Sequence, residues 1–269
     1  MARTMALLDS PIRYGSYGYD ADFGAKTKKA SASSQSVTEV ALAYLKTSSG
    51  VKNMVLKLSA VTLDILSFYN PSNASFKRMS SFSKDAKNYS EAGALPNATI
   101  ELNNKFWEFI ESGNLEALGG LVRKVSEFFV PFADLTKAVS NQFIPLGSRV
   151  LTVVGFAGAT STVLSMCFGI DEEFKKIQNA SEKLSSGKEG QKAVAEAQVS
   201  NSYLIIARNL HYAALGSFSV ASTLMQTLAP VPLMVSLAAG GLFFTIFGHF
   251  HTQMALEPAK KALKAAEDV

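Results

Sequence analysis

The sequence predicts an all-α membrane protein, in which amphipathic helices are followed by hydrophobic helices and a C-terminal hairpin with a proline turn. Two observations predict this fold class. Residues 209–256 run for 48 residues without Asp, Glu, Lys or Arg, and residues 150–170 form a second uncharged block of 21 residues. Core helices of soluble proteins usually carry charge on an outer face. Uncharged runs of this length therefore favour membrane insertion over the alternative, a hairpin buried in the core of a soluble helical protein.

The positive charge of the chain is concentrated in its N-terminal half. Residues 1–149 hold 17 Lys and Arg against 13 Asp and Glu, while the rest of the chain is balanced. A basic surface suits anionic lipid headgroups or nucleic acid. The sequence has no basic stripe with interleaved aromatic residues of the kind that binds single strands. We therefore expect an anionic lipid membrane as a partner, and no nucleic acid.

Residues 1–36 are expected to form a flexible N-terminal tail. Residues 30–36 (ASASSQS) have the low complexity that is typical of a flexible link. Residues 1–32 contain no apolar core of the length that a signal peptide needs, and three aspartates interrupt them. The sequence therefore predicts a tail without a signal peptide.

Residues 37–149 are expected to form an amphipathic helical region that faces the cytosol. Ser36 and Glu39 stand at the two positions of a capping box, which predicts a helix from Val37 onward. Asn70-Pro71 and Leu95-Pro96 predict breaks between helices. Because this region carries the positive excess, we expect it to stay on the cytosolic side.

The helix expected between Phe76 and Gly93 is the most informative one in that region. Its apolar residues recur at helical spacing, and basic residues flank the stripe that they form. Such a helix can lie in the plane of a membrane with its apolar side sunk into the headgroup boundary. The same pattern also fits an ordinary surface helix docked on its neighbours. The predicted membrane-surface residues are Phe76, Lys77, Arg78, Met79, Phe82, Lys84, Lys87 and Tyr89.

Residues 150–256 are expected to form the membrane region, with apolar segments at 150–170, 209–229 and 233–256 and a polar loop at 171–202. At 1.5 Å per residue, 21 residues cross a hydrocarbon core of about 30 Å. Pro230 and Pro232 should break the helix, because proline lacks an N–H group and clashes with the preceding turn. Glycines provide small surfaces where helices approach closely, and the ones predicted for helix packing are Gly155, Gly158, Gly216, Gly240 and Gly241.

The number of full spans depends on residues 150–170. This segment is rich in Ser, Thr and Gly, which favours two full spans with this block buried or in the membrane plane. Two spans keep both ends of the chain on one side, whereas three full spans would put the C-terminus on the opposite side. Residues 257–269 form a polar tail.

Residues for catalysis or metal binding are sparse. The sequence has no Gly-rich phosphate loop, no Ser-His-Asp spacing and no His-Glu-X-X-His motif, so we predict a non-enzymatic protein without a cofactor. His249 and His251 lie two residues apart, which places them on different faces of a helix and argues against a metal site. Cys167 is the single cysteine, which excludes a disulfide within the chain.

The order of these segments resembles the peroxin-11 family. Residues 44–53 (YLKTSSGVKN) are similar to the opening of that family, and the basic helix at 76–93 stands where the family carries its membrane-remodelling helix. The block at 149–176 and the Gly-rich hydrophobic end at 239–250 follow in the same order. The chain departs from the family at Val51-Lys52-Asn53, where Arg-Asp-Lys is preferred, and at His211, where an acidic residue is usual.

The resemblance implies a location and a function. It implies a protein of the peroxisomal membrane, or of a related organelle membrane, that elongates the membrane before fission. It also implies that the chain forms a homo-oligomer and recruits proteins of the fission machinery.

Two other functions share the hydrophobic hairpin. The first is a bacterial effector inserted into a host vacuole membrane, where it binds host partners. The second is a channel or pore, in which Ser and Thr faces and His249 line a path.

Overall fold

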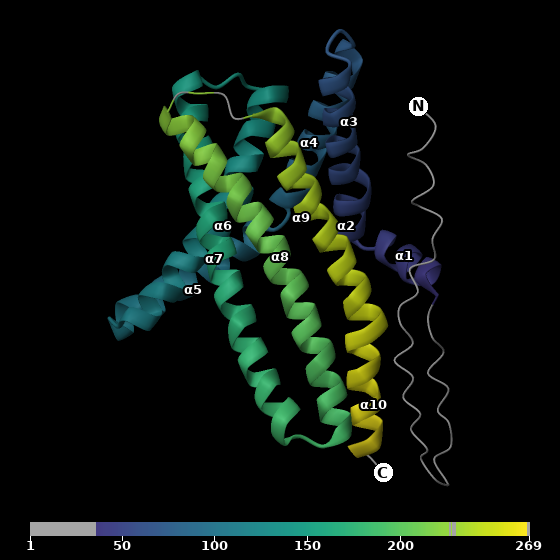
Figure 1. The fold of residues 1–269 in the computed structure, drawn as a ribbon. Coiled ribbons are helices and arrows are strands. Elements are labelled where there is room, and N and C mark those ends of the chain that lie inside the picture. The colour runs from purple at the N-terminus through teal and green to yellow at the C-terminus, as the bar shows by residue number, and fades with distance from the viewer. Residues whose placement is uncertain (1–35, 226, 228–229, 268–269) are drawn as a thin grey trace. The chain divides into compact units, whose positions relative to one another are not determined.

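The computed structural model describes residues 36–225, 227 and 230–267, which form helices and no strand (Figure 1). The prediction of an all-α chain is confirmed for this part of the protein. The flexible tail predicted for residues 1–36 lies outside the described residues except for Ser36.

The described chain begins with a short helical segment and a helical hairpin. Ser36 caps α1 as predicted, because its hydroxyl accepts the Glu39 backbone N–H while the Glu39 carboxylate accepts the Ser36 backbone N–H. The predicted break at Asn70-Pro71 is confirmed, since one helix ends before it and the next starts at Ala74. The elements are α1 (Val37–Leu45), α2 (Ser48–Gly50), the π-helix η1 (Val51–Lys57), α3 (Leu58–Tyr69) and α4 (Ala74–Ala92).

A second hairpin follows, formed by α5 (Leu95–Ser112) and α6 (Leu115–Gln142). Gly113 ends α5 in the left-handed conformation, with φ of 60°, which glycine adopts without a Cβ clash. Asn114 caps α6 by accepting the Ala117 N–H at 2.8 Å. Figure 1 shows α5 projecting away from the other helices, while the later part of α6 lies against α7.

Three long helices pack side by side, with α8 in contact with both α7 and α9 (Figure 1). The predicted break at the two prolines is confirmed: α8 ends at Met225, Pro230 caps α9, and Pro232 lies in its first turn. The first arm of the hairpin is the end of a much longer helix. The elements are α7 (Ser148–Ser186), α8 (Glu189–Met225), α9 (Val231–His251), the π-helix η2 (Thr252–Leu256) and α10 (Glu257–Glu267).

The prediction of a polar loop at residues 171–202 is wrong. Residues 171–186 continue α7, and α8 starts at Glu189, so only Gly187 and Lys188 connect the two helices. Low hydropathy does not by itself indicate irregular structure. Glu, Lys, Ala and Gln are good helix formers whatever their hydropathy, and Lys175 supports the helix by pairing with Asp171 at 2.7 Å, one turn away.

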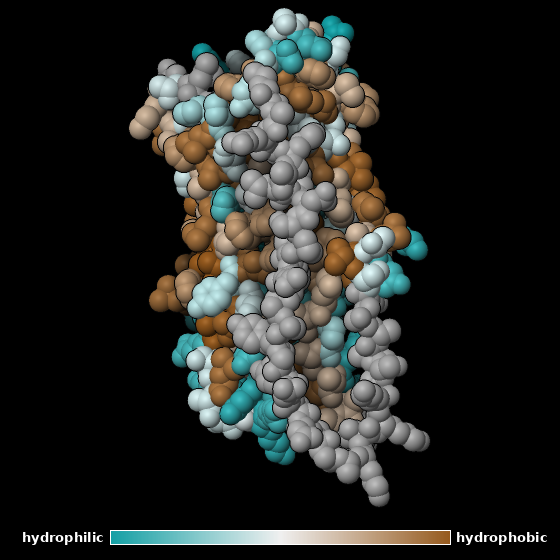
Figure 2. Space-filling view, turned by 45° about the vertical axis from the view of Figure 1, so that its right-hand side comes forward, coloured by the Kyte–Doolittle hydropathy of each residue, from teal (hydrophilic) through white to brown (hydrophobic). Residues whose placement is uncertain are grey.

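Small and polar side chains fill the interior of the described helices, whereas many large apolar side chains lie outside. The largest side chains with less than 2% exposure are Val40, Asn209, Ser126 and Ser202. In contrast, Phe82 is 70%, Phe143 72% and Leu224 68% exposed. Figure 2 shows apolar residues exposed along the flanks and hydrophilic residues gathered at the upper and lower ends. This distribution is the reverse of that of a soluble domain.

Two of the described helices are long and apolar enough to cross a membrane: α7, and the continuous helix Val231–Ala266 formed by α9, η2 and α10. Only 11% of the apolar window of each is buried, unlike the core helix of a soluble protein. The helix α8 does not meet this criterion, because Asn209, His211 and several serines lower the hydropathy of its apolar part. Of the three predicted apolar segments, 150–170 and 233–256 thus lie in the two candidate spans. By this criterion the segment that does not qualify as a span is 209–229, and not 150–170 as expected.

Candidate functional site

The eight predicted membrane-surface residues of α4 divide into three groups. Lys77, Arg78, Met79 and Phe82 are exposed in the first half of the helix. Phe76 and Tyr89 are partly covered, and the Tyr89 ring meets Phe143 edge-on at 6.3 Å between ring centroids. Lys84 and Lys87 are engaged by acidic residues of other helices, which the sequence pattern of α4 could not reveal.

These two lysines form ion pairs. Lys84 Nζ lies 2.7 Å from the Asp64 carboxylate of α3. Lys87 Nζ lies 2.8 Å from Asp134 of α6 and 2.9 Å from Glu91 one turn along α4. Both lysines therefore stabilise contacts within the protein.

The covered face of α4 is polar. Ser80 and Asp85 are buried, and Asp85 accepts hydrogen bonds from the side-chain amides of Asn141 and Gln142 at 3.1 and 2.8 Å. Met79 and Phe82 stay exposed. The helix is thus not a surface helix whose apolar stripe is docked on its neighbours.

The position of α4 relative to α9 follows from the cavities that both helices line. Lys77 and Lys84 line one pocket with Val231 and Val235, near the start of α9. Glu91 lines another with Leu242, further along α9. The two helices therefore run alongside each other. The reason is the polar face of α4, which finds its partners on α3 and α6.

A cluster of charged side chains lies where α4, η1 and α6 meet. We call Lys52, Lys57, Lys87, Glu91 and Asp134 the charge cluster. Besides its contact with Lys87, the Glu91 carboxylate lies 3.6 Å from Lys52 Nζ and 3.8 Å from Lys57 Nζ. The Glu91 carboxylate thus contacts three lysines.

Burial and neighbouring charges shift the pKa values of this cluster. Burial, together with the positive charge of Lys87, lowers the pKa of Lys57 to about 8. Burial alone would lower the pKa of Lys87 as well, but the charges of Asp134 and Glu91 outweigh it and raise that pKa. Burial opposes ionisation of Asp134, yet the charge of Lys87 lowers its pKa below the usual value. Lys57 is therefore the member of the cluster that titrates nearest to neutral pH.

A cavity of about 540 Å³ adjoins the charge cluster, and we call it the charged cavity. Its polar side carries Lys57, Lys84, Lys87, Lys137, Glu91 and Asp134. Its other side is formed by the middle of all three predicted apolar segments: Gly155, Gly158, Ala159, Thr162 and Met166 of α7, Tyr212, Leu215, Gly216 and Ser219 of α8, and Ala238 and Leu242 of α9. Charged groups thus lie beside the most apolar part of the bundle.

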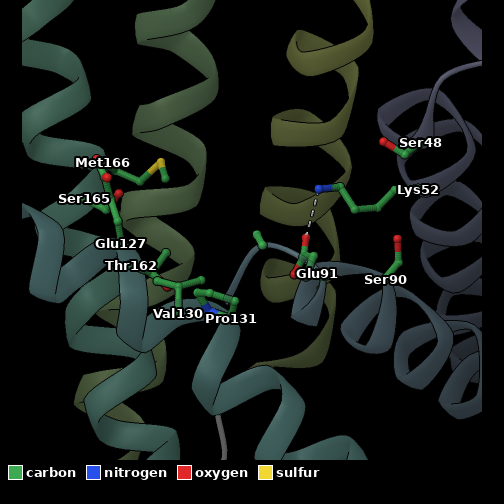
Figure 3. Close-up of a pocket in the computed structure, with 12 residues that line it drawn as sticks. Ser48, Lys52, Ser90, Glu91, Glu127, Val130, Pro131, Thr162, Ser165 and Met166 are labelled. Atoms are coloured by element: carbon green, nitrogen blue, oxygen red, sulfur yellow. Dashed lines mark ion pairs between the residues drawn. The ribbon is translucent and has the colours of Figure 1, made fainter. Parts of the chain in front are cut away.

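A neighbouring cavity of about 660 Å³ shares Glu91, Val130, Thr162 and Met166 with the charged cavity. Figure 3 shows Lys52 reaching toward Glu91 on one side, with Ser165 and Met166 of α7 on the other. Both cavities therefore meet at the Glu91 carboxylate.

The predicted packing glycines lie at contacts between the long helices. A Cβ atom added at Gly158 would lie 2.5 Å from Ala133 of α6, and one at Gly216 would lie 2.9 Å from Val163 of α7. Gly240 and Gly241 of α9 face the rings of His211 and Tyr212 on α8. Gly155 adjoins Lys137, with 3.6 Å between an added Cβ and the Lys137 Cε. Pro230 and Pro232 stand at the start of α9.

Sequence analysis missed the charge cluster as a site. The available signal was the charges that interrupt apolar helical patterns, since Lys52 and Lys57 do so before α3 and Asp134 does so in α6. His249, expected to line a path in a channel, stacks on Tyr44 with ring centroids 3.9 Å apart. Within the described ranges, no three His, Cys, Asp or Glu side chains are grouped so that they could hold a metal ion.

Comparison with protein-family models, with curated proteins and with solved structures gives no match. The resemblance to the peroxin-11 family stays a prediction, which rests on the sequence segments given above.

Proposed function

We propose that this chain is an integral membrane protein inserted through the apolar parts of α7, α8 and α9. The observation that carries the proposal is the exposure of large apolar side chains around an interior of small and polar ones. Lipid tails are as apolar as leucine, so helices in a bilayer gain little by burying such side chains and associate through small and polar residues instead.

Extraction of membranes at alkaline pH tests the insertion. We expect the protein to stay in the membrane pellet after carbonate treatment, together with an integral marker protein, while a peripheral marker is released. Complete release into the supernatant would show that the hairpin is a soluble core.

Within that membrane, the function we propose is to shape or elongate an organelle membrane without enzymatic activity, as a homo-oligomer. The α3–α4 hairpin supports this, because it adds bulk beside the first half of α9 and exposes Met79 and Phe82 next to Lys77 and Arg78. Each basic residue near an anionic surface contributes about 1 kcal/mol to binding. Protein volume inserted into one leaflet of a bilayer expands that leaflet relative to the other and so favours curvature of the membrane.

Reconstitution of the full chain into anionic vesicles tests the shaping function. We expect tubules in electron micrographs with the unaltered protein, and loss of tubules with Phe82→Glu. The matched control is Phe174→Glu, which changes an exposed phenylalanine in the polar part of α7. Equal tubulation by all three proteins would refute a role of the hairpin.

The organelle is proposed from the peroxin-11 resemblance. A peroxisomal location of the tagged chain, with fission proteins as partners, supports it. A location on a host vacuole that requires a bacterial secretion machine favours the effector alternative.

A channel is the second candidate, and one observation favours it. The charged cavity lies against the middle of all three apolar segments, where polar groups line paths in transporters and channels. We expect conductance across planar bilayers if this candidate is correct, and no conductance if the cavities are closed.

A further inference from the structure

An uncharged and mostly apolar stripe runs along the outer surface of η1 and α3, and we call it the α3 stripe. Its members recur every three or four residues from the start of η1 to the end of α3, so they share one face of the helix. All of them are exposed, with 46% exposure for Leu58 and 76% for Tyr69. The stripe consists of Val51, Val55, Leu58, Thr62, Leu66 and Tyr69.

The charged side chains of the same segment lie outside the stripe, and each of them pairs with α4. Lys52 and Lys57 lie 3.6 and 3.8 Å from the Glu91 carboxylate. Asp64 lies 2.7 Å from Lys84 Nζ. Charged residues at membrane depth face the interior of a helix bundle and pair with one another. The segment therefore has the arrangement of a membrane helix, although three charges interrupt its sequence.

The segment follows α9 from one end to the other. Tyr44, which precedes η1, stacks on His249 near the end of α9. Phe68, near the end of α3, lines a cavity of about 250 Å³ with Val231, the first residue of α9. Both η1 and α3 contact α9, and Figure 1 shows α3 alongside its first half. The segment and α9 thus run antiparallel over the apolar length of α9.

The length and the ends of the segment match a bilayer. The 7 residues of η1 and the 12 residues of α3 extend about 28 Å at 1.5 Å per residue, close to a hydrocarbon core of about 30 Å. Tyr69 stands at the end of α3, and the exposed Lys77 and Arg78 follow in the first turns of α4. Aromatic and basic side chains gather in this way at a membrane–water boundary.

We propose that η1 and α3 cross the bilayer beside α9, with the α3 stripe in contact with lipid acyl chains. Over the same depth α9 exposes Val231 and Phe243, so the two apolar surfaces meet the same environment. The turn at residues 70–73 then lies on the side of the membrane where α7 and α9 begin. This position differs from the cytosolic one expected for residues 37–149. The inference goes beyond the membrane-shaping function but rests on the proposed insertion of α9.

Labelling of single cysteines tests the position of the turn. Cys167 is the one cysteine of the chain, so Cys167→Ser provides a background without thiols. Three exposed serines are then changed singly: Ser72→Cys in the turn, Ser148→Cys at the start of α7 and Ser186→Cys at its end. In intact organelles, we expect a membrane-impermeant maleimide to label Ser186→Cys, and to label Ser72→Cys and Ser148→Cys only after permeabilisation.

The comparison with Ser148→Cys holds in either orientation of the protein. The proposal is overturned if Ser72→Cys reacts from the same side as Ser186→Cys while Ser148→Cys stays protected, and that result leaves the insertion of α7, α8 and α9 intact. It is also overturned if Ser72→Cys does not react even after permeabilisation. Labelling of all three variants in intact organelles would show that no bilayer separates the two ends, which contradicts the insertion itself.

Quenching by bromine atoms on lipid acyl chains tests the contact with lipid. Trp107 is the one tryptophan of the chain, so Leu58→Trp in a Trp107→Phe background reports from the middle of the α3 stripe. We expect brominated lipids to quench Leu58→Trp as strongly as Phe243→Trp, at an exposed position of α9. Phe174→Trp, in the polar part of α7, is the matched control and should keep its fluorescence.

A second copy of the chain is the other occupant to distinguish. If it covers the α3 stripe, Leu58→Trp keeps its fluorescence while Phe243→Trp loses it, and the contact with lipid is overturned. If neither variant is quenched, the insertion of α9 is contradicted as well. Leu66→Trp, two turns further along the stripe, repeats the measurement if Leu58→Trp does not fold.

Discussion

Two carboxylates, those of Glu91 and Asp134, lie beside four lysines in the charged cavity. Three of these lysines, Lys57, Lys84 and Lys87, pair with a carboxylate of another helical element. Lys87 is the most engaged, since it contacts both. Loss of either carboxylate leaves a partly buried ammonium group without its counter-ion, which is more costly than loss of an exposed pair.

We therefore predict that Asp134→Asn lowers the free energy of unfolding by about 2–3 kcal/mol, because Lys87 loses its closest partner. Unfolding by denaturant in detergent measures this change. Asp171→Asn is the control, since it breaks an exposed pair with Lys175 at 2.7 Å and should cost less than about 1 kcal/mol. Equal losses of unfolding free energy in both variants would mean that the Lys87–Asp134 pair contributes no more to stability than an exposed pair.

Lys57 should make stability depend on pH. Its pKa of about 8 in the folded chain lies below the ordinary value of 10.5, so the unfolded chain binds more protons between these two values. Stability should therefore rise as the pH increases from about 8 toward 10.5, by up to about 3 kcal/mol. The charged groups that face Lys57 are Lys52, Lys87, Glu91 and Asp134, and Tyr212 contributes its ring.

The measurement is the unfolding free energy of the protein in detergent across this pH range. Lys57→Met keeps the apolar stem and removes the charge, so its profile should be flatter. A profile of the unaltered protein no steeper than that of Lys57→Met would show that another group is responsible.

At the scale of elements, the contacts between long helices depend on positions without side chains. Gly158 of α7 faces Ala133 of α6, and Gly216 of α8 faces Val163 of α7. Close approach of this kind allows helices to associate where burial of large apolar side chains gives little advantage.

We predict that Gly158→Ala destabilises the protein by about 1–3 kcal/mol, because the new Cβ would lie 2.5 Å from that of Ala133. Thermal unfolding in detergent measures the change. Adding Ala133→Gly should restore part of the loss, since the two positions are in contact. Gly119→Ala is the control, because nothing lies within 4 Å of a Cβ there. If Ala133→Gly restores no stability, the loss caused by Gly158→Ala does not arise from the contact with Ala133 but from another part of α7.

At the scale of the whole molecule, the arrangement of helices places the start of the described chain beside the end of α9. Tyr44, near the start, stacks on His249, near the end of α9. The helices α7, α8 and α9 alternate in direction, so the connection at 143–147, the end of α8 and the start of α9 lie at one end of the apolar segments and the polar parts of α7, α8 and α10 at the other.

We therefore predict that tags at the N-terminus and the C-terminus lie on the same side of the membrane. In intact organelles, added protease should digest both tags or neither, and we expect both to be digested because the basic N-terminal half favours the cytosol. The control is permeabilised organelles, where both must be digested. Digestion of one tag alone would contradict this topology.

Structural features that depend on residues close together in the sequence could be predicted from the sequence alone. The capping box at Ser36, the break at Pro230 and Pro232 and the uncharged apolar segments follow from hydrogen bonding and steric limits within a few turns of helix. The prediction of a loop at 171–202 failed because hydropathy, and not helix propensity, was used for that segment.

The charge cluster was decided only by the tertiary structure. A helical pattern shows that α4 has basic residues beside an apolar stripe, but it does not show that Lys87 meets Asp134, 47 residues away. Lys57, Lys87 and Asp134 belong to three different elements, and their distances follow from the packing of η1, α4 and α6. Ion pairs between helices depend on which faces meet, and that is fixed when the polar face of α4 is covered by α3 and α6.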